Sequence, residues 1–545
     1  MLLCSVTGDV VVTHSSARPW SDGPQAALRR LRGYLLGCVS VDTRSLATFR
    51  ILLGLLVIAD LLLRAWNFGF YYTDGGVVPQ SLAERGAAEH AFSVYYHVSE
   101  PESIAALFLL QGAFALALVV GYRTRAATVV SFLFVVSLDH HNPFVLSYAD
   151  TLFRLLFFWA IFLPLGERWS VDALHATGPR RQTVAGVATA LAMAQMVFMY
   201  FLNGVHKATS ETWRSGDAAP LVFGIDEMTF LLGDFVRAFP TLVGYGGLVW
   251  FSMLLGSFLL ILLHGRLRIA MVALFVLGHA SFAVTVRIGA FAYVAIAGLT
   301  LFLQSGFWCD AGRVARRLGV DPATIETRVR TTVSIPLATT LPTARLPARV
   351  DRLKRAVSVL AIGLVAGAML LVVALAVLNA GAVADDTYDQ DEVNALVEEH
   401  AVGGHVYLVA ESLGIRQPEW SVFAPQPRTT DRYYVFGGRT VDGERVDVFN
   451  DRAFTWDRPG DQLQKQHDTY RMRFFMNSVR RGSVGGDLTA SYGEHLCRTY
   501  AEAYDIELSH ISMFEVTERI TLDTIDDPSG RESDRNHFYR HECGR

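Results

Sequence analysis

Lys207 is the residue whose type and position could most directly do chemistry. It follows His206 at the end of an apolar run over residues 184–203. A lysine in such a position usually extends its ammonium group into the water beside a membrane. In a dry pocket, however, desolvation disfavours the ammonium form, and a neutral amine can act as a general base. Lys207 and His206 are therefore candidate catalytic residues, with a membrane anchor as the alternative.

Charged residues inside apolar runs form a second group of candidates, because a charge within a membrane needs a partner or a purpose. Arg50, Asp60 and Arg64 lie in the first apolar run, and Asp150 and Arg154 lie in a later one. In each run an aspartate precedes an arginine by four residues, which puts both on one helix face. This membrane polar cluster predicts either buried ion pairs that fix helix register or a polar cavity for an anionic or quinone head group.

Other motifs provide no stronger catalytic candidate. Residues 139–142 include His140 and His141, but adjacent histidines on a helix point in different directions and no third ligand is evident. We therefore expect a polar loop at the membrane surface there, and no metal site. His279 is expected to pack between helices, and Arg287 to lie at a helix end. The sequence contains no P-loop, HExxH, GxSxG or dinucleotide-binding motif.

The elements that must position these residues are mainly apolar. Of the 545 residues, 51% are hydrophobic and 18% are charged, and the mean hydropathy is +0.30. A helix needs roughly 20 apolar residues to cross a bilayer. The sequence predicts an all-α polytopic bundle of about nine spans, at residues 46–65, 103–122, 126–142, 150–167, 184–203, 242–263, 269–287, 288–306 and 356–380.

The basic residues between these runs predict the orientation of the bundle. They gather in the N-terminal segment and in four loops that share one side of a nine-span arrangement. The loops 67–102 and 139–149, on the other side, hold one arginine, Arg85. The positive-inside rule therefore places the N-terminus in the cytoplasm and the C-terminal part outside the cell membrane.

Charge also divides the chain into unlike parts. Residues 385–545 contain 30 acidic and 18 basic residues, a net charge of −12, whereas the preceding residues have 22 and 30, a net of +8. This distribution argues against nucleic-acid binding, and the apolar content excludes disorder of the first part. We predict a cytoplasmic amphipathic N-terminus at 1–44, a membrane domain at 45–310, a basic cytoplasmic loop at 311–355, a last span at 356–380 and an external acidic domain at 384–545.

The last part has the pattern of a small α+β domain. Two alternating runs within residues 432–449 are joined at Asp442-Gly443, which predicts a β-hairpin. Helices are expected over 470–479 and 487–504, and a strand over 511–522. Cys497 and Cys543 can form a disulfide if the domain lies outside the cell, although the sequence does not supply the geometry.

Several segments together resemble the horizontally transferred transmembrane (HTTM) domain, the membrane domain shared with vitamin K-dependent gamma-carboxylase. The resemblance covers residues 44–310 and extends more weakly into the C-terminal part. No single segment is decisive, but their order and spacing are specific. The matching pieces are DTRSLATFRI at 42–51, with Gly54; YTDGG at 72–76, with Pro79; WSVD at 169–172; GVHK at 204–207; and WSVFAPQP at 420–427.

The resemblance implies a chemistry, a cofactor and partners. The carboxylase uses a lysine to deprotonate vitamin K hydroquinone, and oxygenation of the quinol yields a base that takes a proton from glutamate before carbon dioxide adds. Lys207 matches that lysine, and His206 replaces the first lysine of the family's pair. The implied cofactor is a reduced quinone of the vitamin K or menaquinone type, without a metal, and the implied partner is an exported peptide or protein.

Three functions are therefore open at this stage. The first is a carboxylase-like lyase or oxygenase that modifies an external or membrane substrate, with Lys207 as general base. The second is a non-catalytic quinone- or lipid-binding scaffold, or a maturation factor for an exported peptide. The third is a transporter. The sequence shows no paired broken helices and no inverted repeat, and their absence argues against this function.

Overall fold

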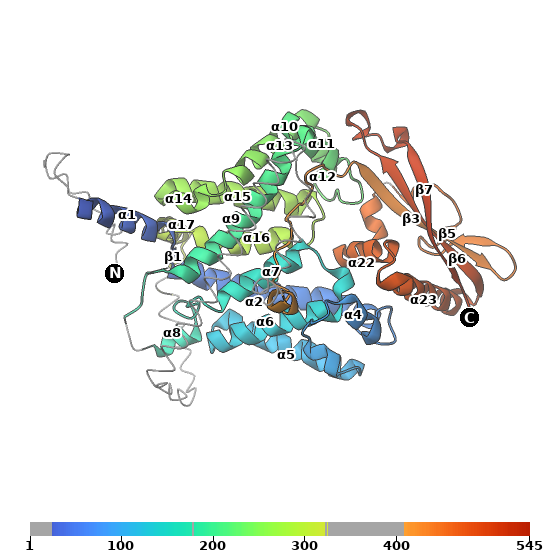
Figure 1. Ribbon diagram of the computed structural model, residues 1–545, viewed down its shortest axis with the longest axis horizontal. Helices are drawn as coiled ribbons and strands as arrows, with labels where there is room; N and C mark the ends of the chain where they lie inside the picture. Colours follow the sequence, from blue (N-terminus) through green and yellow to red (C-terminus); the bar gives the residue numbers. More distant parts are fainter. Residues whose placement is uncertain (1–23, 177–178, 322–323, 325–407, 461, 545) are drawn as a thin grey trace.

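The computed structural model describes residues 24–176, 179–321, 324, 408–460 and 462–544. The predicted span 356–380 lies outside the described residues, as do residues 1–23, most of the predicted loop 311–355 and residues 384–407. The described chain forms a bundle of helices that ends against a β-sheet domain (Figure 1). The bundle holds the sequence-predicted site residues, and its junction with the sheet domain positions them.

Apolar helices of spanning length run through the bundle. Four helices are long and apolar enough to cross a membrane: α2 (Thr43–Trp66), α5 (Pro101–Val120), α9 (Val187–Ala208) and α15 (Gly265–Thr285). A fifth candidate is a pair of helices, over residues 291–302 and 305–317, that meet at an angle of 106°. The described residues therefore contain four or five candidate spans, and the predicted count of nine is not confirmed.

The other predicted spans form shorter or interrupted helices. Helix α7 (Tyr148–Ala160) has 13 residues. At 1.5 Å per residue it covers about 20 Å, less than the roughly 30 Å of a hydrocarbon core. The predicted run 242–263 is divided near Gly256 into α13 (Pro240–Leu255) and α14 (Leu259–Leu262). The apolar pattern thus located helices correctly but did not reveal where each helix ends.

Shorter elements complete the bundle. Strand β1 (Ser40–Asp42) pairs antiparallel with β2 (Thr183–Ala185), and the Asp42 carboxylate then caps α2 by accepting from the Arg44 N–H at 2.8 Å. The remaining helices are α1 (Pro24–Cys38), α3 (Phe68–Tyr71), α4 (Gln80–Gly86), α6 (Thr124–His141), α8 (Val171–His175), α10 (Glu211–Ser215), α11 (Ala218–Phe223), α12 (Gly233–Arg237), α16 (Phe291–Leu299) and α17 (Ser305–Arg317).

The C-terminal domain contains a five-stranded antiparallel sheet with the order β5-β4-β3-β6-β7. The predicted hairpin is present, because the Thr440 N–H donates to the Glu444 carbonyl at 3.0 Å and Gly443 takes a φ of 92°. Strand β7 was not predicted. The strands are β3 (Thr430–Thr440), β4 (Arg445–Asp447), β5 (Arg452–Ala453), β6 (Leu508–Arg519) and β7 (Ser533–Glu542).

Two helices, α22 (Tyr470–Arg480) and α23 (Asp487–Tyr504), lie on the side of the sheet that faces the bundle (Figure 1). They agree closely with the helices predicted from the sequence. Helix α22 packs on the short helix η2 (Pro143–Val145), where Ser478 Oγ donates to the Phe144 carbonyl at 3.0 Å. From α23, Ser491 Oγ donates to the Val77 carbonyl at 2.7 Å. These helices join the sheet to the bundle.

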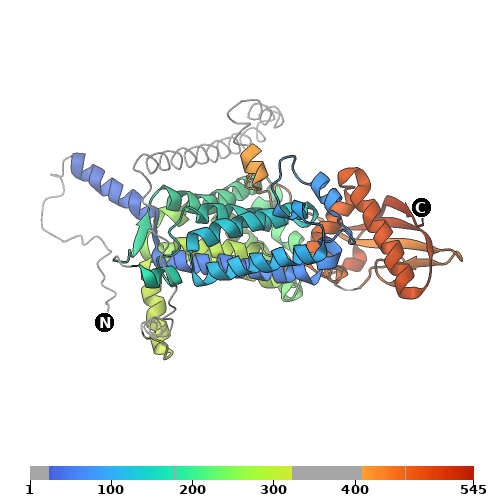
Figure 2. The same cartoon turned by 90° about the horizontal axis from the view of Figure 1, so that it is seen from below.

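The two ends of the bundle differ in character. In Figure 2 the long helices run side by side, with the C-terminal domain at one end and α1 and α17 at the other. Arg123 and Thr124, which begin α6, donate their N–H groups to Asp172 in α8 at 2.9 and 2.8 Å. The basic loops before α6 and before α8 therefore meet at the end opposite the C-terminal domain, where Figure 1 shows α8.

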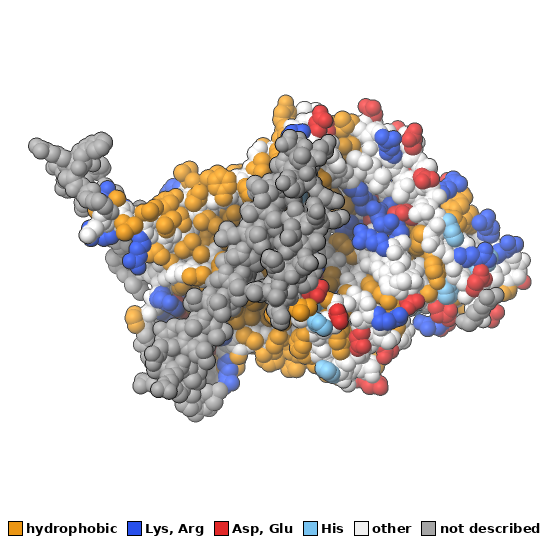
Figure 3. Space-filling view, in the orientation of Figure 1, with side chains coloured by type: hydrophobic (Ala, Val, Ile, Leu, Met, Phe, Trp, Pro, Cys, Tyr) orange, Lys and Arg blue, Asp and Glu red, His pale blue; other side chains and the backbone are white. Residues whose placement is uncertain are grey.

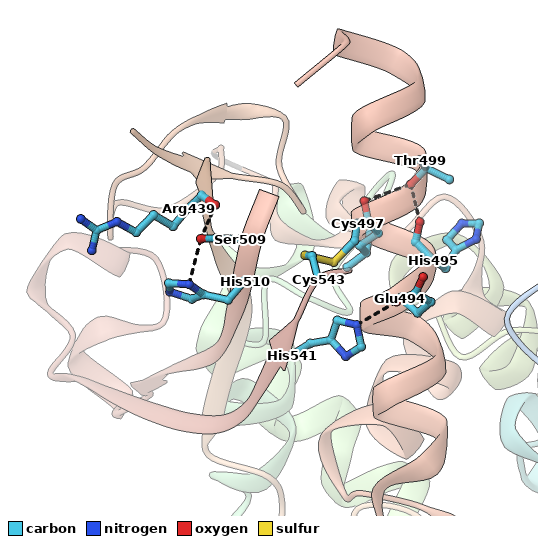
Figure 4. The surroundings of a disulfide bond; sticks show 10 residues. Arg439, Glu494, His495, Cys497, Thr499, Ser509, His510, His541 and Cys543 are labelled. Atoms are coloured by element: carbon cyan, nitrogen blue, oxygen red, sulfur yellow. Dashed lines mark hydrogen bonds and ion pairs between the residues drawn. A yellow bond between two sulfur atoms is a disulfide. The ribbon is translucent and has the colours of Figure 1, made fainter. Parts of the chain in front are cut away.

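A disulfide between Cys497 and Cys543 fastens the end of the chain to α23 (Figure 4). The bond closes a loop with a sequence separation of 46 residues, and the two Cα atoms are 5.8 Å apart. The pairing that the sequence left open is therefore present. Beside it, His541 lies 3.2 Å from the Glu494 carboxylate and makes a second contact between β7 and α23.

Replacing Cys543 with serine is expected to destabilise the C-terminal domain by about 2–4 kcal/mol, because the unfolded chain regains the freedom of a long loop. The free energy of unfolding would be measured by chemical denaturation in detergent, with and without a reductant. Reductant should lower the wild-type midpoint to that of the variant and leave the variant unchanged. An equal response of both proteins would contradict the prediction.

Candidate functional site

A stretch of irregular backbone, residues 417–426, runs along α9 and leads into β3; we call it the junction segment. Trp420 is fully buried. The backbone φ angles of Trp420 and Phe423 are 53° and 52°, in a range that residues other than glycine rarely adopt. Asn203 of α9 donates from Nδ2 to the Trp420 and Val422 carbonyls at 2.7 and 3.1 Å. The segment therefore turns its backbone carbonyl groups toward α9.

Lys207 is buried against these carbonyl groups, with 2% of its surface exposed. Its Nζ donates to the Val422 carbonyl at 2.6 Å and more weakly to the Phe423 carbonyl at 3.4 Å. It also lies 4.0 Å from the centre of the Trp213 ring, whose Nε1 donates to the same Phe423 carbonyl at 2.7 Å. Among the described residues, no carboxylate lies within 4.0 Å of Nζ. Neutral groups therefore surround the amine, not a counter-ion.

His206 has a different environment from Lys207, although the two are adjacent. Its Nε2 lies 3.0 Å from the Glu419 carbonyl, and its side chain is only partly buried. This contact holds the start of the junction segment to α9. In this geometry His206 positions the segment.

The residues that surround Lys207 were only partly visible in the sequence. The stretch 420–427 appeared as part of a family resemblance, without a role in the site. Asn203 and Trp213 stood near Lys207 in the sequence, but their hydrogen bonds to Trp420 and Phe423 depend on more than 200 residues of intervening chain. The sequence offered one sign that these two stretches, near Lys207 and at 417–427, could meet: both contain aromatic and amide side chains.

An open pocket of about 440 Å³ adjoins the junction segment. It is bounded by Glu419 and by Tyr148, whose ring packs 5.8 Å from that of Trp420. Lys207 does not line this pocket. The lining residues are Tyr148, Thr151, Arg154, Glu411, Gly414, Arg416, Gln417, Pro418 and Glu419.

The predicted membrane polar cluster exists, but with different members. Arg64 binds Asp60 at 2.7 Å and Asp139 at 2.5 Å. Arg471, from α22 of the C-terminal domain, binds Asp60 at 2.5 Å and Asp150 at 2.9 Å. The side chains of the C-terminal domain thus complete a buried network inside the helical bundle.

Two details of this network correct the sequence-based expectation. The predicted pair of Asp150 and Arg154 is not formed, because Arg154 binds Asp139 at 2.5 Å while Asp150 turns to Arg471. The polar loop expected at 139–142 is also wrong. Residues up to His141 belong to α6, and Asp139 is only 2% exposed, since two arginines draw it into the bundle.

The two histidines beside Asp139 serve packing. His140 Nδ1 lies 2.9 Å from the Phe92 carbonyl, and His141 stacks on Tyr95 with ring centres 5.2 Å apart. Within the described parts of the chain, no group of three or more His, Cys, Asp or Glu side chains is arranged so that it could hold a metal ion. His279 packs between helices as expected, with Nε2 2.7 Å from the Tyr200 hydroxyl.

Arg50 lies apart from the network to which the sequence assigned it. Its guanidinium donates to four backbone carbonyl groups, including those of Leu165 at 3.0 Å and Trp169 at 2.5 Å. Three of these acceptors belong to the chain between α7 and α8, and the fourth is the Val119 carbonyl at the end of α5. Arg50 therefore holds a loop of the bundle in place and is not part of the candidate site.

A second charged contact joins the domains through the loop before α12. The Asp226 and Glu227 N–H groups donate to the Asp431 carboxylate at the start of β3, at 2.9 and 3.0 Å. The Glu227 carboxylate in turn accepts from Arg428. Burial alone would raise the pKa of Glu227, but Arg428 and the other arginines nearby outweigh it and hold the pKa at about 2.

The depressed pKa of Glu227 predicts acid sensitivity at this contact. Because an ordinary glutamate titrates near 4.3, the carboxylate stabilises the folded state above that pH, and this stabilisation is lost as the pH falls toward about 2. The shift corresponds to about 3 kcal/mol. Thermal unfolding in detergent should show Glu227→Gln less stable than wild type at neutral pH and equal to it near pH 2. The exposed Glu532→Gln should follow wild type throughout; a pH-independent difference for Glu227→Gln would contradict this reading.

Comparison with known proteins adds one finding. The model of the HTTM domain matches residues 39–307, which include α2 to α16 and Lys207. No curated protein and no solved structure matches the chain. The match and the apolar helices of spanning length identify a membrane protein. The chain belongs to the HTTM domain family.

Proposed function

We propose that this membrane protein catalyses a quinol-linked modification of an external or membrane substrate, with Lys207 as the general base. The observation that carries the proposal is the burial of Lys207 without a carboxylate partner among the described residues. An unpaired ammonium is costly in such a place, so a neutral amine able to accept a proton is favoured. The geometry also suits the protonated product, because two carbonyl groups and the Trp213 ring face Nζ.

The residues beside the site fit a quinone head group. The pocket's volume of about 440 Å³ is in the usual range for small-molecule sites, roughly 300–1,000 Å³. Tyr148, Thr151 and Gln417 offer hydroxyl and amide groups that can donate to and accept from ring oxygens. A reduced quinone would supply the reducing equivalents for chemistry with oxygen. Gln417, Pro418 and Glu419, which line the pocket, belong to the same junction segment as the carbonyl groups that face Nζ.

A specific observation also favours a non-catalytic function. The recorded hydrogen bonds of Lys207 Nζ go to the junction segment itself, so the residue can serve solely to fasten that segment to α9. In that case the protein is a quinone- or lipid-binding scaffold, or a maturation factor for an exported peptide. Loss of Lys207 would then affect stability more than chemistry.

We also propose that the C-terminal domain lies outside the cell membrane and the N-terminus in the cytoplasm. The basic loops before α6 and before α8 lie at the end of the bundle away from the C-terminal domain, in agreement with the positive-inside rule (Figure 1). The Cys497–Cys543 disulfide supports the same orientation, because disulfides persist in oxidising compartments. An external domain can meet an exported peptide or protein substrate.

The proposal is tested by incorporation of labelled bicarbonate into protein. Membranes that contain the chain would receive reduced quinone and oxygen, and wild type would be compared with Lys207→Ala. The exposed Lys465 provides the matched control, as Lys465→Ala. Labelling that depends on quinol and is lost only in Lys207→Ala would support the base. Labelling that persists in Lys207→Ala would exclude Lys207 as the base, and no labelling of any protein would favour the scaffold.

A further inference from the structure

Arg473 in α22 is a largely buried cation without an ion-pair partner among the residues that the structure describes. Only 7% of its surface is exposed, its Nε is buried without a hydrogen-bond partner, and no ion pair joins its guanidinium to a described residue. Its one recorded contact is with the adjacent Phe474 ring, 4.7 Å from Cζ. Burial lowers the pKa of Arg473, because loss of water destabilises the charged form of the guanidinium. Native proteins rarely leave a buried charge in this state, because desolvation is not repaid.

The charges around Arg473 are mostly of the same sign. Those that act on it are Glu227, which attracts it, and Arg428, Arg432 and Arg287, which repel it. Arg287 is committed to backbone, since it donates to the Gln464, His467 and Asp468 carbonyls. His467 faces Glu227 at 3.9 Å, and burial lowers its pKa to about 4, so it is neutral at physiological pH. Positive charge is therefore in excess around Arg473.

In two other buried networks of the described chain, the acidic side chains considered are equal in number to the arginines. In the bundle, three aspartates face three arginines: Asp60, Asp139 and Asp150 with Arg64, Arg154 and Arg471. At the start of β3, three acids face three arginines: Asp226, Asp431 and Glu518 with Arg237, Arg458 and Arg531. Around Arg473, three acids face five arginines: Glu227, Glu515 and the exposed Asp468 with Arg287, Arg428, Arg432, Arg473 and Arg480.

We propose that this cluster is a binding site for a phosphate group at the junction of the two domains. A phosphate presents several acceptor oxygens and carries enough negative charge to offset much of the excess, and arginine matches its geometry well. Figure 3 shows Lys and Arg side chains gathered between the apolar surface of the bundle and the C-terminal domain, on the side where α22 lies. Arg428 and Arg480 are partly exposed, with side-chain exposures of 21% and 24%, so an anion can approach from this surface.

The location restricts the source of the phosphate to two kinds. Arg287 follows directly after α15, one of the apolar helices of spanning length, so the cluster lies near the expected membrane surface. A phospholipid headgroup can therefore reach it from the membrane, and a free phosphate can reach it from water. Both would be held by the same guanidinium groups.

The test compares wild type with Arg473→Met in detergent, after removal of bound lipid. Without phosphate, Arg473→Met should have the higher melting temperature, because it removes a buried unpaired charge. Adding inorganic phosphate or micelles of phosphatidylglycerol should raise the wild-type melting temperature by about 2 °C and leave Arg473→Met unchanged. Arg481→Met, an exposed arginine beside the end of the same helix, is the control and should respond like wild type.

Each outcome has one meaning. A response to both phosphate and lipid places a general phosphate site at Arg473, and a response to lipid alone identifies a headgroup site. The proposal is overturned if neither addition raises the wild-type melting temperature, or if Arg473→Met rises as much as wild type. It is also overturned if Arg473→Met is less stable than wild type in phosphate-free detergent, because Arg473 would then have a structural partner.

Discussion

Arg471→Met is expected to destabilise the protein by about 3–5 kcal/mol and to loosen the C-terminal domain from the helical bundle. The Arg471 side chain is 4% exposed and binds both Asp60 and Asp150. Its removal leaves two carboxylates with fewer partners inside the bundle, and the cost of a buried unpaired charge exceeds the net value of the original ion pair. The measurements are the melting temperature in detergent and the rate at which a protease releases the C-terminal domain.

The matched control is Arg481→Met, an exposed residue directly after α22 that should change both quantities little. A second variant separates charge balance from packing. Asp150→Asn combined with Arg471→Met removes one of the orphaned charges, so the double variant should regain part of the lost stability. If Arg471→Met resembles Arg481→Met, or if the double variant is no more stable than Arg471→Met, the network does not join the domains.

Lys207→Arg is expected to reduce quinol-dependent labelling by a factor of about 10²–10⁴, the usual contribution of a general base. Arginine keeps a cation and several N–H donors, so it can still hold the Val422 carbonyl, but it does not give up its proton at neutral pH. The variant therefore removes the proposed base while it preserves the attachment of the junction segment. Labelling and the melting temperature would be measured on the same preparations.

Asn203→Leu is the complementary variant, because Asn203 binds the same segment through the Trp420 and Val422 carbonyls but cannot serve as the base. It should lower stability by about 1–3 kcal/mol, the cost of unpaired buried carbonyls, and leave most of the labelling. Labelling retained in Lys207→Arg would exclude the base. Labelling lost equally in both variants would show that the segment's position, and not the amine, controls the reaction.

Much of the local structure was predictable from the sequence. The hairpin at Gly443 and the helix α23 follow from turn residues and from the spacing of apolar side chains over a few positions. The same is true of the apolar helices α2, α5, α9 and α15. These features depend on neighbours along the chain, so a single sequence contains the information that determines them.

The length of each helix within a membrane was less predictable. Helix α7 ends at Ala160 although the apolar run continues to Gly166, and the run at 242–263 divides near Gly256. An apolar run shows that its residues avoid water. A helix buried within a bundle has such a run just as a membrane-spanning helix does. The distinction depends on what surrounds each helix.

The sequence by itself determined the class of this protein: a mainly helical membrane chain with an acidic α+β end, and Lys207 as its most notable ionisable residue. Only the tertiary structure decided the partners of the charges. Arg471 meets Asp60 across 411 positions, and Lys207 meets Val422 across 215. An ion pair or a hydrogen bond between distant residues leaves no local pattern, because its free energy depends on a distance that only folding creates. For the same reason, Arg473 could be recognised as a cation without an ion-pair partner in the described part of the chain only after folding.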